Sequence, residues 1–208
     1  MPLQNRVAPD GALHATPHRG TLMGNRGGRL HDPATRRLLS QGWRSIRWIA
    51  CTLCFRRRHR DVMGAGYTEL FFLDEVTALA DGHRPCFECR RADALRFQAA
   101  WQTAHALPTP PRASEMDALL HRERRTGRTK RTLRRPLSDL PPGSMIRMGD
   151  TPLAVRETGL LPWSFAGYGA QIARPACETL VELLTPPAVV AALQAGYRPL
   201  WHASAGPC

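Results

Sequence analysis

Four cysteines form the most informative pattern in this chain, because they come as two pairs with the same spacing. Cys51 and Cys54 are separated by two residues, and Cys86 and Cys89 repeat that spacing after residues 55–85. This spacing allows both thiolates of a pair to point at one ion from a tight turn. Two such pairs build a tetrahedral site with Zn–S bonds of about 2.3 Å, and soft thiolates select zinc over magnesium or calcium. The pattern predicts a Zn²⁺ site.

The identity of the fourth ligand stays open in the sequence. Side chains alternate between the faces of a regular strand, so Cys51 and Cys54 would point in opposite directions unless a turn or bulge intervenes. His59 and His83 are the alternatives to Cys54. A redox pair or inert buried thiols are further interpretations, although no βαβ pattern surrounds the cysteines as it does in thioredoxin-like proteins.

The segments around the cysteines predict the elements that must position them. The run WRSIRWIACTLCF, residues 43–55, is apolar and aromatic and favours a strand that ends at the first cysteine pair. Residues 67–73 predict a second strand. Asp74 can cap a short helix that follows, and Gly82 is a stop signal for it. Residues 92–106 predict a longer helix after the second pair.

The stretch FFLDEVTALADGHRPCFECRRAD resembles the end of the Ada-type zinc domain, the methylphosphotriester-repair half of bacterial alkylation-response proteins. That family runs a cysteine pair, an arginine-rich stretch, a strand with paired phenylalanines, an alanine-rich helix and then Gly-x-Arg-Pro-Cys-x-x-Cys-Arg. This chain has a similar order: its first cysteine pair, Arg56–Arg60, Phe71 and Phe72, Thr77–Ala80 and Gly82–Arg90. The resemblance covers about residues 44–92 and is specific in its last part.

The resemblance implies that all four cysteines hold zinc and that Cys51 is the counterpart of a thiolate that accepts a methyl group from a backbone phosphotriester. The chain also departs from the family. The family's first pair is usually spaced by three residues with Arg-Pro after the first cysteine, whereas Thr52 and Leu53 fill a two-residue gap here. The sequence contains no helix-turn-helix signature and no Pro-Cys-His-Arg alkyl-acceptor motif, so repair of O6-alkylguanine is not implied.

The charge of the chain points to a polyanionic partner. The formal net charge is +12 and the sequence pI about 10.8, a balance that favours DNA or RNA. The expected nucleic-acid contacts lie near the cysteines, at a glycine-rich turn and in a basic segment: Arg26, Arg29, Arg44, Arg47, Arg56, Arg57, Arg58, Arg60, Arg128, Lys130 and Arg131. A solvated basic surface is the alternative, and a zinc-stapled module with a protein partner is another.

The organisation of the chain predicts an α+β protein, with a small zinc-stapled domain and a short-stranded β-rich region closed by a helix. Proline-rich and basic stretches mark the expected boundaries. The predicted parts are a loose arm (1–18), an Ada-like zinc-binding domain (19–107), a linker with a helix and basic arm (108–139), and the β-rich region (140–208). In the third part, Ser114 and Asp117 suggest a capping box. In the fourth, Thr185 suggests the cap of the closing helix.

Other residues support alternative interpretations. Asp117, His121 and Glu123 lie at helical spacing and would suit a metal-dependent hydrolase or nuclease, although they are also ordinary helix-surface charges. Five aromatic residues of the β-rich region are candidates for base stacking or for its core: Trp163, Phe165, Tyr168, Tyr197 and Trp201. Cys177 and Cys208 have no neighbour at ligand spacing.

The chain carries no predicted membrane or export signal. No apolar run approaches the roughly 18 residues of a membrane helix, and the first thirty residues lack the apolar segment of a secretory signal. We therefore expect a cytoplasmic protein without a membrane partner. Reduced thiols in that compartment favour metal ligands or reactive thiols over disulfides.

Overall fold

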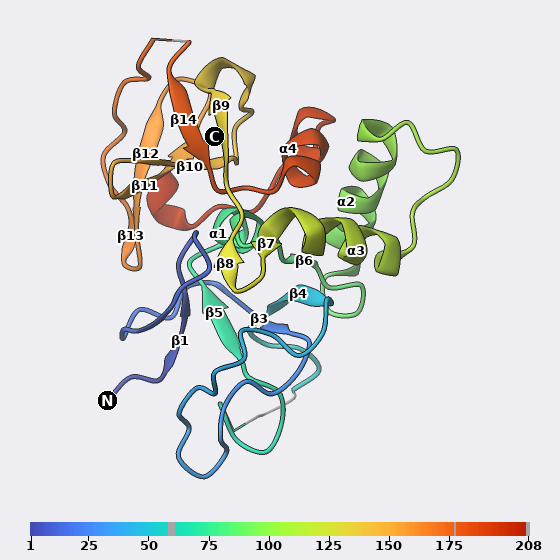
Figure 1. Ribbon diagram of the computed structural model, residues 1–208, viewed down its shortest axis with the longest axis vertical. Helices are drawn as coiled ribbons and strands as arrows, with labels where there is room; N and C mark the ends of the chain where they lie inside the picture. The colour runs from blue at the N-terminus through green and yellow to red at the C-terminus, as the bar shows by residue number, and fades with distance from the viewer. Residues whose placement is uncertain (58–60, 177, 207–208) are drawn as a thin grey trace.

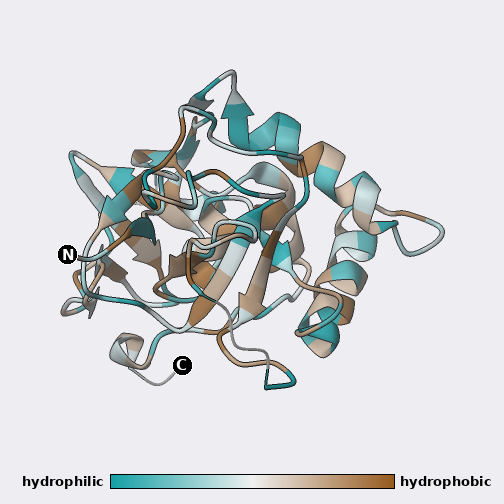
Figure 2. Cartoon of the chain, turned by 90° about the horizontal axis from the view of Figure 1, so that it is seen from below, coloured by the Kyte–Doolittle hydropathy of each residue, from teal (hydrophilic) through white to brown (hydrophobic). Residues whose placement is uncertain are grey.

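The computed structural model describes residues 1–57, 61–176 and 178–206, and it confirms the predicted α+β class. Two sheets lie on either side of a short central helix, α1 (Glu75–Ala80), with longer helices along one side (Figure 1). Apolar stretches gather in the interior strands, and hydrophilic residues lie on the surrounding loops and helix faces (Figure 2).

The first sheet is built from the N-terminal part of the chain and carries the first cysteine pair. Its neighbours pair antiparallel except β1 with β5 and β4 with β6, which run parallel. In spatial order its strands are β2 (Leu13–Ala15), β1 (Gln4–Val7), β5 (Leu70–Phe72), β3 (Leu22–Arg26), β4 (Trp48–Thr52) and β6 (Arg84–Pro85). Phe72 is fully buried on this sheet.

The second sheet comes from the C-terminal part and is antiparallel throughout. In spatial order its strands are β13 (Gly167–Tyr168), β12 (Leu160–Ser164), β11 (Thr151–Val155), β10 (Met145–Met148), β14 (Leu180–Leu183) and β9 (Leu133–Pro136). A separate hairpin joins β7 (Arg125–Thr126) and β8 (Thr129–Lys130), and single 3₁₀ turns occupy Leu137–Asp139 and Ala203–Ala205.

Three further helices pack beside the sheets: α2 (Arg91–Ala104), α3 (Ala113–Arg124) and α4 (Pro187–Gln194). Their buried faces share a cluster that contains Phe97, Trp101, Leu120 and Val189. A second cluster joins α1 to the C-terminal sheet, with Val76 beside Trp163. The two sheets are therefore linked through one continuous packing arrangement around α1.

Helix α1 begins and ends as its sequence predicts. Asp74 is the N-cap and its carboxylate accepts hydrogen bonds from the backbone N–H and hydroxyl of Thr77, both at 2.9 Å. Gly82 follows the C-cap with a φ of +84°, the left-handed conformation that glycine adopts without strain. Asp74 also accepts from the Tyr168 hydroxyl and the His202 N–H, which ties the cap to the C-terminal region.

Three sequence expectations about local structure are wrong. The segment expected as a loose arm, residues 1–18, contributes β1 and β2 to the first sheet. Helix α3 is capped by Arg112 with Glu115 rather than by Ser114. The closing helix starts from Pro186, while the Thr185 hydroxyl accepts a hydrogen bond from Met145 N–H. In each case strand pairing or a hydrogen bond with another residue replaces the arrangement that the local sequence pattern predicts.

Candidate metal centre

Cys51 and Cys86 meet because β4 and β6 run parallel. Ala50 is aligned with Pro85 across this pair of strands. The next residues are Cys51, which is still within β4, and Cys86, which directly follows β6, so the two cysteines lie side by side. The N–H of Cys86 donates to the carbonyl of Ala50 at 3.0 Å, which fixes the two segments at this point.

A tight turn brings the third cysteine back to the other two. The Glu88 N–H donates to the Cys86 sulfur at 3.4 Å, and the Arg90 N–H donates to the Cys86 carbonyl at 3.1 Å. This turn folds Cys89 over Cys86. The sulfurs of Cys51, Cys86 and Cys89 all lie within 4.8 Å of one another. Sulfurs around a tetrahedral zinc are about 3.8 Å apart, so these three thiols can hold a metal ion after small side-chain adjustments.

The three thiols strongly perturb one another. Hydrogen bonds from Cys51 and Cys89 lower the pKa of Cys86 to about 2, and backbone N–H groups of Cys89 and Glu88 act in the same direction. Hydrogen bonding to Cys86 and Cys89 raises the pKa of Cys51, and burial adds to the shift. A cluster that shares its protons in this way already favours one thiolate, which is the protonation state that metal binding requires.

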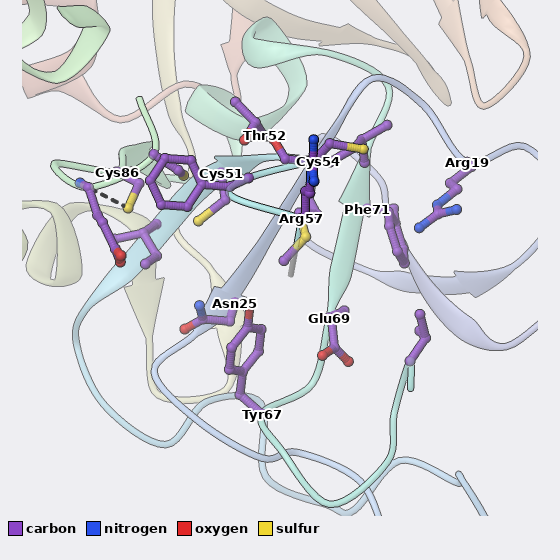
Figure 3. Close-up of a pocket in the computed structure, with 17 residues that line it drawn as sticks. Arg19, Asn25, Cys51, Thr52, Cys54, Arg57, Tyr67, Glu69, Phe71 and Cys86 are labelled. Atoms are coloured by element: carbon purple, nitrogen blue, oxygen red, sulfur yellow. Dashed lines mark hydrogen bonds between the residues drawn. The ribbon is translucent and has the colours of Figure 1, made fainter. Parts of the chain in front are cut away.

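Cys54 does not join the group. Strand β4 ends at Thr52, and the Thr52 hydroxyl donates to the Cys54 carbonyl at 2.9 Å in the turn that follows. Cys54 is exposed and lies apart from Cys51 and Cys86 in Figure 3. The end of β4 and the turn that follows it therefore keep the second thiol of the pair away from the first.

The histidine alternatives to Cys54 have separate outcomes. His83 is fully buried between the rings of Trp48 and Phe72, and its Nδ1 lies 3.1 Å from Asp81 Oδ2. It belongs to a buried charge cluster and does not fall within the cysteine group. His59 lies outside the described residues.

Two buried arginines fix the turn of the second cysteine pair from both sides. On one side, Arg84 makes a two-pronged ion pair with Asp117 of α3, with both N–O distances at 2.9 Å. On the other, Arg90 pairs with Glu75 of α1 at 2.9 Å and with Asp93 at 2.8 Å. Opposite charges held in this way orient the backbone of the turn and therefore the thiols that it carries.

A cavity of about 370 Å³ opens beside the three thiols (Figure 3). One end is formed by the cysteines, and Arg19 lies at the opposite end, against Phe71. The walls between them carry both polar and apolar groups: Asn25, Ile49, Phe55, Arg57, Tyr67 and Glu69. The thiol group is thus not enclosed, because all three thiols line an accessible space.

Most of the arginines expected to bind nucleic acid are exposed, but two of the predicted residues are not. Arg26 is 3% exposed, and its guanidinium donates to Asp81 at 2.8 Å and to the Gly11 carbonyl at 2.7 Å. Lys130 donates to the Ala80 carbonyl, and burial lowers the pKa of Lys130 to about 8. Arg26 and Lys130 therefore support the interior charge cluster. The exposed ones are Arg29, Arg44, Arg47, Arg56, Arg57, Arg128 and Arg131, while Arg58 and Arg60 lie outside the described residues.

The second candidate site, on α3, does not assemble. Asp117 is bound to Arg84, His121 packs edge-on against the ring of Trp43, and Glu123 accepts a hydrogen bond from the Ala188 N–H. These contacts give each side chain a structural partner. The three residues do not form a metal-ligand group within the part of the chain that the structure describes.

The C-terminal aromatic residues serve the core. Trp163 donates to the Thr77 hydroxyl, Tyr168 to Asp74 and Tyr197 to Glu75. Phe165 and Trp201 are partly buried against the same interior. Cys177 and Cys208 fall outside the described residues.

Sequence reasoning missed the residues that complete the cavity. Arg19 belongs to the segment between β2 and β3, Asn25 lies on β3, and Glu69 immediately precedes β5. No local pattern marks them, because their proximity depends on strand order. Compared with models of protein families, with curated proteins and with solved structures, the chain matches none.

Proposed function

We propose that this protein binds Zn²⁺ through Cys51, Cys86 and Cys89 and uses the surrounding basic surface to bind nucleic acid, in the manner of an Ada-like zinc domain. The observation that carries the proposal is the convergence of three thiols at the ends of two parallel strands. Thiolate ligands are the donor set that zinc prefers over harder cations such as Mg²⁺.

The nucleic-acid part of the proposal rests on charge. The loop after β4 carries exposed Arg56 and Arg57, and Arg44 and Arg47 are exposed shortly before the strand. Arg56 and Arg57 have φ values of 49° and 54°, a conformation that side chains other than glycine rarely adopt. Strained residues of this kind cluster at functional sites, and guanidinium groups beside the metal site suit contact with phosphates.

The decisive experiment measures zinc content of purified protein by elemental analysis, in the wild type and in three serine variants. We expect one zinc per chain in the wild type, its loss in Cys51→Ser and Cys86→Ser, and its retention in Cys54→Ser. Circular dichroism establishes that each variant folds. Wild-type protein without zinc, purified without chelators, would contradict the metal assignment.

A gel-shift titration with a short duplex and with a single strand tests the second part. Binding at low salt that weakens when Arg56 and Arg57 are both changed to Gln supports it. Arg134→Gln is the matched control, because this exposed arginine lines a different hollow on the second sheet. Failure to shift either nucleic acid at low salt would leave a zinc protein whose partner is another protein.

A second candidate function is methyl transfer to Cys51, as the Ada resemblance implies. The specific observation in its favour is that Cys51 belongs to the thiol group and also lines the open cavity. A zinc-bound thiolate remains deprotonated and nucleophilic at neutral pH. Mass spectrometry after incubation with DNA that carries a methylphosphotriester would show one added methyl group on Cys51, and an unmodified peptide would reject this function.

A further inference from the structure

The three thiols leave one coordination position of a tetrahedral metal without a described ligand. Zinc bound to three protein ligands with a fourth position open is the arrangement of catalytic rather than structural sites. All three cysteines line the same cavity, so the open position of the metal faces that cavity. Cys54 lines the cavity but stands outside the thiol group.

Charge decides what kind of atom completes the metal site. Three thiolates already exceed the charge of Zn²⁺ by one, so a neutral nitrogen or oxygen donor suits the fourth position better than a phosphate oxygen, which adds charge and is a harder donor than a thiolate. An anionic part of a ligand must therefore lie elsewhere in the cavity.

The opposite end of the cavity offers that place. The Arg19 guanidinium lies 4.5 Å from the centre of the Phe71 ring, and Arg6 lies 5.0 Å from the same ring. Burial and the nearby charge of Arg19 both lower the pKa of Arg6. Within residues 1–57, 61–176 and 178–206, no acidic side chain forms an ion pair with Arg19 or Arg57. Arg19 and Arg57 both line the cavity, and cations without a paired carboxylate favour an anion beside them.

The size of the cavity limits the ligand. A volume of about 370 Å³ lies at the small end of the range of about 300–1,000 Å³ that is usual for small-molecule sites. One nucleotide fits such a space, whereas a double helix does not. The walls contain Tyr67, whose ring suits contact with a planar group.

We propose that the metal keeps its fourth coordination position open toward this cavity, and that a phosphate-bearing ligand of about nucleotide size binds there. Its phosphate lies between Arg19 and Arg57, and a neutral donor atom at its other end faces the metal. This inference rests on the proposed zinc site and specifies it further: the nucleic acid would present a single unpaired nucleotide to the metal.

The test uses full-length protein in which Co²⁺ replaces zinc, because the visible d–d absorption of Co²⁺ reports its ligands. Adenosine 5′-monophosphate is added as the probe, and adenosine serves as its uncharged match. We expect a saturable change in absorption, with adenosine binding about tenfold more weakly since it lacks the phosphate. Arg19→Gln and Arg57→Gln should weaken binding of the monophosphate by a similar factor and leave binding of adenosine unchanged. Arg134→Gln should change neither affinity.

Two variants examine the fourth ligand directly. Cys54→Ser and His59→Gln should leave the Co²⁺ spectrum of the ligand-free protein unchanged. A changed spectrum in either variant would show that the protein itself closes the position and would overturn the inference. Equal affinity for the two probes, or no response to the monophosphate, would also overturn it while leaving the zinc site intact. Protein that takes up neither zinc nor Co²⁺ would instead overturn the proposed function.

Discussion

His83 shows how a single buried residue links the stability of the protein to pH. Burial between Trp48 and Phe72 lowers the pKa of His83 to about 4, the contact with Asp81 opposes that shift, and the charges of Arg26 and Arg124 add to it. The unfolded chain therefore takes up a proton near pH 6.5 that the folded protein refuses until about pH 4. The stability that comes from neutral His83 is present above pH 6.5 and is lost as the pH falls toward 4.

The corresponding prediction is that His83→Gln flattens the pH dependence of stability. Between pH 6.5 and 4 the wild type should lose about 3 kcal/mol more of its free energy of unfolding than the variant does. Urea denaturation of both proteins at several pH values measures the difference, and acid effects on the cysteines cancel because both proteins share them. Parallel pH profiles would show that His83 is not buried in its neutral form.

At the scale of elements, the two-pronged pair between Arg84 and Asp117 anchors β6 to α3. Both side chains are buried, so removing one leaves the other as an unpaired charge. We expect Arg84→Met to cost about 3–5 kcal/mol of stability and the double variant Arg84→Met with Asp117→Leu to recover part of that loss. Thermal and urea unfolding check this, and a single variant as stable as the wild type would contradict the anchoring role.

The cap of α1 is the second element-scale prediction. Asp74 accepts hydrogen bonds from Thr77, Tyr168 and His202, so it holds the helix start and the C-terminal region together. Asp74→Ala should cost about 2–4 kcal/mol, the sum of a lost cap and of buried donors left without an acceptor. Asp74→Asn keeps one side-chain oxygen, the amide oxygen, which can still accept hydrogen bonds, so this variant should lose less stability. Equal stability of the Ala and Asn variants would show that these hydrogen bonds contribute nothing.

At the scale of the whole molecule, metal binding and folding are expected to be linked. A ligand that binds the folded state at about 1,000 times its dissociation constant adds about 4 kcal/mol of stability. Adding a chelator should therefore lower the melting temperature of the wild type and leave Cys86→Ser unaffected, because that variant has already lost the metal. The same shift in both proteins would mean that the chelator acts elsewhere.

The net charge of +12 leads to the remaining whole-molecule prediction. If about six exposed arginines contact phosphates, the logarithm of the binding constant should fall with the logarithm of salt concentration with a slope of about −5. Fluorescence anisotropy with a labelled oligonucleotide over a salt series measures this slope. Salt-insensitive binding would indicate that the basic surface is merely solvated.

No helix among the described residues is long and apolar enough to span a membrane.

The local signals of the sequence predicted what local interactions control. The cap of α1 by Asp74, the glycine that ends it and the mixed α+β class all depend on neighbours within a few residues or on average composition, so one sequence was sufficient. The two-residue spacing of Cys86 and Cys89 likewise sets the geometry of their turn. The pattern also predicted that the first cysteine pair lies at the end of a strand.

Only the tertiary structure decided which thiols meet. Parallel pairing of β4 with β6 sets Cys51 beside Cys86, and the end of β4 turns Cys54 aside. Arg26 looked like any surface arginine in the sequence, yet Asp81 holds it in the interior. The cavity with Arg19 is a consequence of strand order in the first sheet. Strand order and register join residues far apart in the chain, and no local spacing encodes them because many pairings satisfy the same local preferences.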